Sequence, residues 1–156
     1  MSNPFFDQPD DLWLVDGSLR DVYIQAASPE DWRALLKLTR EHVHEYARDG
    51  VVQELPELVA IFADREHSHL LRIEVAAVKI HCHFFVPDEI ELDIDPREVV
   101  GPREHSAVLD FLERLSGATR KSVRLTSENS PESVLLSYEP AQSIWHIHNS
   151  GGESDA

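Results

Sequence analysis

The sequence predicts an α+β fold, a two-layer sandwich in which a mostly antiparallel sheet carries two long helices and one short helix on one face. Segments with the two-residue periodicity of strands outnumber the stretches with helical periodicity. The gaps between the last three predicted strands are too short for parallel crossover connections. A chain of 156 residues with 42% hydrophobic residues can also bury a core without disulfides or metal.

Residues 1–17 are expected to form an irregular N-terminal arm, because they contain two prolines, a glycine and several acids. Apolar side chains such as Trp13 indicate that the arm docks in places. Residues 149–156 are rich in Gly, Ser and acids and are expected to be a disordered tail. The remaining chain, 1–148, is predicted to be a single domain.

The first strand is expected over 19–26, with Val22 and Ile24 facing inward. Ser28 and Pro29 then have the character of a helix N-cap and first helical residue. The spacing of the apolar residues predicts that this helix continues to about Asp49 and ends at Gly50. A shorter helix is expected after Pro56.

The stretch 70–85 is predicted to be two strands, 70–76 and 78–85, or one long strand with a bulge at Ala76–Ala77. A further strand follows at 89–95. A second long helix begins at Gly101–Pro102 and is expected to end at Gly117. Three short strands, 122–126, 134–138 and 143–148, complete the prediction, and their order in the sheet cannot be read from the sequence.

A hairpin formed by 78–85 and 89–95 has a register that the apolar pattern specifies, because a slip of one residue would place acids in the core. Its predicted loop is Val86–Asp88. The expected inner pairs are Phe84–Ile90, Cys82–Leu92 and Ile80–Ile94, and the expected outer pairs are His83–Glu91, His81–Asp93 and Lys79–Asp95.

This outer row allows two interpretations. It is either a solvated face whose opposite charges pair across strands, or a metal site formed by His81, His83, Glu91 and Asp93. Two histidines and two carboxylates suit a divalent transition metal such as zinc, iron or manganese. No cofactor is required by any other feature of the sequence.

Histidine pairs also occur at 42/44, 67/69 and 146/148. The last pair would join the hairpin histidines only if its strand lay beside the hairpin, with Trp145 and Ile147 in the core. We expect 67/69 in a solvent-facing loop, 42/44 on a helix where they cannot share an ion, and His105 to be exposed.

The net charge of −15 disfavours binding to nucleic acids and anionic membranes and favours a basic protein partner. The densest acidic segment contains the candidate partner-binding residues Glu89, Glu91, Asp93 and Asp95. A homodimer that covers the sheet face stays open as a further interpretation.

No recognised catalytic or phosphate-binding motif is present, so the sequence favours a binding protein over an enzyme. The single cysteine, Cys82, is expected to be a buried, inert thiol, and the N-terminus does not resemble a signal peptide, which favours the cytoplasm. In size, charge and fold class, the chain is similar to the small acidic immunity proteins that neutralise toxin domains. That resemblance implies a basic partner and assigns no residues.

Overall fold

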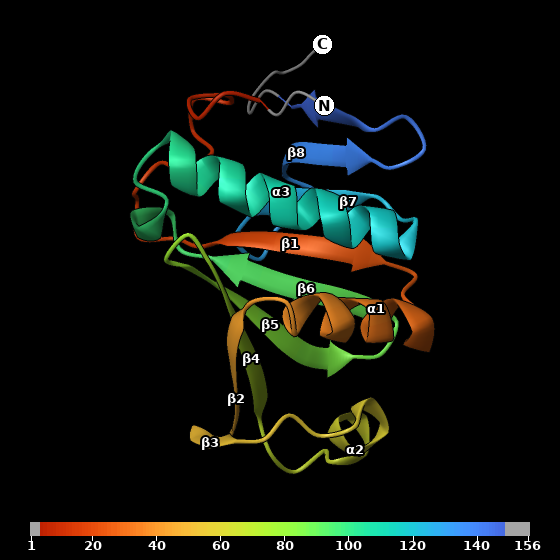
Figure 1. The fold of residues 1–156 in the computed structure, drawn as a ribbon. Helices are drawn as coiled ribbons and strands as arrows, with labels where there is room; N and C mark the ends of the chain where they lie inside the picture. Colours follow the sequence, from red (N-terminus) through yellow and green to blue (C-terminus); the bar gives the residue numbers. More distant parts are fainter. Residues whose placement is uncertain (1–3, 149–156) are drawn as a thin grey trace.

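A computed structural model describes residues 4–148, so the tail predicted at 149–156 lies outside the described residues. Nine strands form one antiparallel sheet in the order β3-β2-β4-β5-β6-β1-β7-β8-β9 (Figure 1). The strands are β1 (Arg20–Gln25), β2 (Val43–Arg48), β3 (Val51–Gln53), β4 (His69–Val75), β5 (Val78–Val86), β6 (Glu89–Ile94), β7 (Val123–Ser127), β8 (Val134–Glu139) and β9 (Ile144–Ile147).

The helices are α1 (Pro29–Thr39), α2 (Leu58–Ala63) and α3 (Pro102–Thr119), with a short 3-10 turn, η1, at Pro96–Glu98. Figure 1 shows α1 and α3 in front of the sheet, and the core lies between these helices and the sheet. The predicted α+β sandwich is confirmed. No helix within residues 4–148 is long and apolar enough to cross a membrane.

The first helix is shorter than its sequence pattern predicts. Helix α1 begins at a capping box formed by Ser28 and Asp31 but ends at Thr39. The predicted continuation to Asp49 is wrong, because residues 43–48 form β2 and pair with β4. Asp49 and Gly50 then adopt φ values of 50° and 79° in the turn to β3. Asp-Gly is a common hairpin dipeptide, and it is the signal that would have shown this turn.

The alternatives for 70–85 are resolved as two strands joined by a tight turn. Ala76 and Ala77 occupy that turn with φ values of 45° and 70°. In the next hairpin, the register shifts between His83 and Val86, so that Val86 pairs with Glu89 in place of the predicted Phe84–Ile90 pair. The bulge shortens the loop from the predicted three residues to two.

Two predicted ends of elements also change. Helix α3 continues past Gly117 to Thr119 and ends where Arg120 adopts a left-handed conformation with a φ of 60°. In β9, Trp145 is buried, whereas Ile147 is 43% exposed and does not belong to the core. Trp145 is held against α3 by a 2.7 Å hydrogen bond that its indole donates to Glu113.

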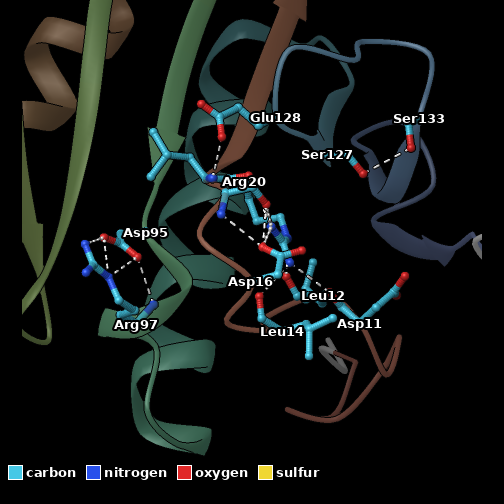
Figure 2. A network of polar contacts seen from close by, with 12 residues as sticks. Asp11, Leu12, Leu14, Asp16, Arg20, Asp95, Arg97, Ser127, Glu128 and Ser133 are labelled. Carbon is cyan, nitrogen blue, oxygen red and sulfur yellow. Dashed lines mark hydrogen bonds and ion pairs between the residues drawn. The ribbon is translucent and has the colours of Figure 1, made fainter.

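The N-terminal arm is held by the buried guanidinium of Arg20 (Figure 2). This group donates hydrogen bonds to the backbone carbonyls of Leu12 at 2.6 Å, Leu14 at 2.9 Å and Asp11 at 3.1 Å. Glu128 supports the same region by accepting a 2.8 Å hydrogen bond from the amide of Leu19. These hydrogen bonds therefore fix the position of the arm relative to the start of β1.

His105 is a second anchor of the arm, and the prediction that it is exposed is wrong. Its side chain is 1% exposed. Trp13 donates a hydrogen bond to its Nδ1 at 2.9 Å, and its Nε2 donates to the carbonyl of Pro4 at 2.7 Å. Sequence reasoning placed it on the surface of α3 because nothing in the pattern indicated that the arm covers that helix turn.

Candidate functional site

The candidate site is the face of the sheet opposite α1 and α3. Strand register aligns two rows of polar side chains across β5, β6, β1 and β7. One row contains His83, Glu91, Tyr23 and Arg124. The other contains His81, Asp93, Asp21 and Thr126. We call these eight residues the polar face.

Asp93 is the centre of the predicted hairpin site. His83 donates a 2.5 Å hydrogen bond from Nε2 to one oxygen of Asp93, and Nδ1 of His81 lies 3.4 Å from the other. Burial opposes ionisation of Asp93, but the hydrogen bonds from the two histidines outweigh it and lower its pKa to about 2. The same hydrogen bond raises the pKa of His83 above its ordinary value.

Asp21 and Tyr23 extend this site onto β1, and sequence reasoning missed both. Asp21 is 3% exposed and accepts hydrogen bonds from the amide of Asn129 at 2.7 Å and from the Tyr23 hydroxyl at 3.2 Å. Burial raises the pKa of Asp21, and the negative charges of Asp93 and Glu128 raise it further. Alternation puts Asp21 and Tyr23 on the polar side of their strand, but only the strand order brings them to the hairpin.

Glu91 lies in the middle of these carboxylates. Burial raises its pKa, and the neighbouring charge of Asp21 adds to the effect. Within residues 4–148, neither Glu91 nor Asp21 forms an ion pair with a lysine or arginine. His83 partly offsets the charge of Glu91, and Arg124 lies in the same row with Tyr23 between them. Glu91 and Asp21 therefore hold negative charge without an ion pair to a lysine or arginine of the described chain.

The other candidate partner-binding residues differ in their surroundings. Glu89 is half-buried at the end of β6, where it pairs in register with Gln25. Asp95 binds Arg97 with an Oδ2–Nη2 distance of 2.6 Å and caps η1. Lys79 lies 3.8 Å from Glu74, so it does not form the ion pair with Asp95 that the sequence predicts.

The histidine pairs do not converge. Strands β1, β7 and β8 separate β9 from the hairpin, so His146 and His148 share no site with His81 and His83. His69 is not a loop residue but begins β4. Its ring nitrogens contact the Tyr46 hydroxyl at 2.5 Å and the Asp64 carbonyl at 3.1 Å.

Across residues 4–148, no three His, Cys, Asp or Glu side chains form a group that could hold a metal ion. The metal site predicted at His81, His83, Glu91 and Asp93 stays a prediction. It requires about one transition metal per chain, and the metal would be lost in the His81→Ala/His83→Ala variant. Cys82 adds no ligand there, since it faces the core, where burial raises the pKa of its thiol.

Comparison of the chain with protein families, curated proteins and solved structures finds no match. By its fold, the chain is an α+β sandwich protein.

Proposed function

We propose that this protein is a cytoplasmic binding module that uses its polar face to hold a cationic segment of a protein partner. One observation carries the proposal: Asp21 and Glu91 are crowded together on the face without a lysine or arginine partner. Burial raises the pKa of both residues, the charge of Asp21 raises the pKa of Glu91 further, and the charges of Asp93 and Glu128 do the same for Asp21. A cationic side chain placed against Glu91 would offset the burial and repulsion that disfavour its ionised form.

Three nearby cations of the chain are already engaged, whereas Arg124 of the polar face, which Tyr23 separates from Glu91 in the same row, forms no ion pair within residues 4–148. Arg72 forms an ion pair with Glu45, Lys79 lies near Glu74 and Arg97 is bound to Asp95. These internal pairs leave Glu91, the half-buried carboxylate of β6 on the polar face, without a lysine or arginine partner and available for an external cation.

The net charge extends this local effect to the whole molecule. A field from −15 charges attracts a basic partner and raises the association rate, and salt screens that attraction. Such a module would act as an immunity protein does. An immunity protein neutralises a toxin domain by covering it, and this mode of action needs no catalytic group or metal.

The test compares two triple variants that change the net charge equally. Glu91, Asp93 and Asp95 are changed to Lys in the face variant, and the exposed Glu54, Glu57 and Glu66 are changed to Lys in the control. A partner captured by the wild-type protein is purified, and its association and dissociation rates are measured with each variant at 50 and 300 mM salt.

We expect the partner to be basic, its association with the wild type to slow with salt, and its binding to be lost in the face variant but retained in the control. An equal loss of partner binding in the two variants would mean that net charge alone, and not the polar face, accounts for binding. Unchanged binding by the face variant would exclude the polar face as the docking surface.

A further inference from the structure

A cavity of about 460 Å³ lies at one end of the sheet, between α2, the segment 64–68, the start of β4 and the end of β5. Figure 1 shows α2 beside this end of the sheet. The volume lies within the usual range of small-molecule sites. Its lining combines aromatic and aliphatic side chains with an arginine and three histidines.

The charge of the lining differs from that of the rest of the molecule. Its one carboxylate, Asp64, already lies 3.3 Å from Arg48 and 3.4 Å from His69. Arg65 also lines the cavity, and it makes no hydrogen bond or ion pair with any other residue between 4 and 148.

Two histidines of the lining are arranged alike. His67 donates a 2.5 Å hydrogen bond from Nδ1 to Asp49, and His83 donates one of the same length from Nε2 to Asp93. The remaining ring nitrogen of each has no partner in the described chain. The hydrogen bond to Asp93 favours the charged form of His83, whose second N–H can donate to an anion. His67 lines the same cavity.

The apolar part of the lining is built around aromatic rings. Phe62 and Phe84 meet edge to face with centroids 5.9 Å apart, and Trp32 packs against both behind them. Ile61 and Leu70 complete this wall. The cavity therefore has an aromatic and aliphatic wall on one side and a group of hydrogen-bond donors beside it.

We propose that this cavity binds a small organic anion, a carboxylate or phosphate with an apolar or aromatic body. Arg65 and the unpartnered nitrogens of His67 and His83 hold the anionic group, and Phe62 and Phe84 contact the body. A metal ion fits less well, because Arg65 repels it and only two ring nitrogens of the lining are unengaged. The site is separate from the docking function of the polar face and shares only His83 with it.

The test titrates phenyl phosphate and benzoate into the ¹⁵N-labelled full chain and follows the amide resonances. Inorganic phosphate and benzyl alcohol test the anionic group and the body separately. We expect saturable binding of at least one of the two aromatic anions, with a Kd of about 1 mM or tighter, and shifts confined to Ser68, His69, His83, Phe84 and their neighbours. Each isolated half should bind at least about tenfold more weakly.

Arg65→Gln should weaken the binding at least about tenfold. The spectrum of the free variant should remain that of a folded protein. Arg103→Gln is the matched control, since Arg103 is exposed on α3 and contacts only its neighbour Glu104. The proposal is overturned if neither anion gives saturable shifts, if both arginine variants bind like the wild type, or if the shifts map elsewhere. Zinc that shifts the same amides without competition from phenyl phosphate would assign the cavity to a cation instead.

Discussion

Among single residues, Arg20 is the one whose environment is hardest to predict from the sequence pattern. An alternating strand with a basic residue at its start suggests a solvated side chain, yet this guanidinium is 4% exposed and bound by carbonyls of the N-terminal arm. Without Arg20, the carbonyls of the fully buried Leu12 and of Leu14 would lose their donor within the described chain, whereas that of Asp11 would keep the amide of Leu14. The sequence contains no signal for this role, because the partners are backbone atoms whose position depends on how the arm folds back.

Arg20→Met is therefore expected to lower the free energy of unfolding by about 2–4 kcal/mol, because it removes the donor of the Leu12 and Leu14 carbonyls and with it the attachment of the arm to β1. Urea denaturation measures the change, and limited proteolysis should show cleavage in residues 4–18. Arg97→Met serves as the control, since Arg97 is 74% exposed and should change stability by less than about 0.5 kcal/mol. Equal effects of the two variants would contradict the anchoring role.

Asp93 is the second residue whose effect can be measured directly. Its pKa is lowered to about 2 in the folded state, below its ordinary value of 3.8, so its contribution to stability is present above pH 3.8 and is lost as the pH falls towards 2. Its hydrogen bond also raises the pKa of His83, whose contribution is present at low pH and lost as the pH rises through that pKa.

Asp93→Asn should lower the pKa of His83, as measured by NMR titration of the ring. It should also destabilise the fold by about 1–2 kcal/mol at pH 7 and flatten the loss of stability below pH 4. Glu89→Gln is the control, because it changes one carboxylate of the same strand that does not contact His83. A His83 pKa that is the same in wild type and Asp93→Asn would show that the pair does not form in solution.

At the level of elements, the turns decide where strands begin and end. The Asp49–Gly50 turn converts the second half of a predicted helix into the strand pair β2–β3, and the bulge in β5 shortens the next hairpin. Local helical periodicity in residues 40–49 is outweighed by pairing with β4, which buries Tyr46 against Leu71. The β5–β6 register was predicted correctly from His81–Asp93 to His83–Glu91, where the apolar alternation specifies it, and was wrong at the bulge that follows.

The β4–β5 turn carries strain that a glycine can relieve. Ala77 has a φ of 70°, a conformation that costs an alanine about 1 kcal/mol and costs glycine little. Ala77→Gly should raise the free energy of unfolding by about 0.5–1 kcal/mol in urea denaturation. Ala107→Gly, inside α3, should lower it by about 1 kcal/mol, and a loss of stability in both variants would show that the turn is not strained.

At the level of the whole molecule, the charge of −15 acts against the compact state as well as in favour of a basic partner. Exposed ion pairs such as Arg33–Glu30, Arg72–Glu45 and Arg114–Glu41 contribute little, so screening should relieve more repulsion than it removes attraction.

Raising the NaCl concentration from 20 to 300 mM should therefore raise the Tm by about 2–4 °C. The Glu54/Glu57/Glu66→Lys control used for the docking test should show a smaller rise, because it carries less net charge. A Tm that falls with salt would mean that the ion pairs outweigh the repulsion.

The sequence by itself determined the α+β class, most of the strands, the β5–β6 register around His81, Cys82 and His83, and the acidic character of the surface. These follow from periodicity, turn residues and composition, which act over a few residues or over the whole chain at once. Only the tertiary structure decided that β1 lies between β6 and β7. That order brings Asp21 and Tyr23 to Glu91 and Asp93 and keeps His146 and His148 apart from the hairpin. The pairing of β4 with β5, together with the packing of the segment before β4, puts Arg65 and His67 at one cavity with His83. Strand order and loop packing depend on contacts between residues far apart in the chain, which no local pattern encodes.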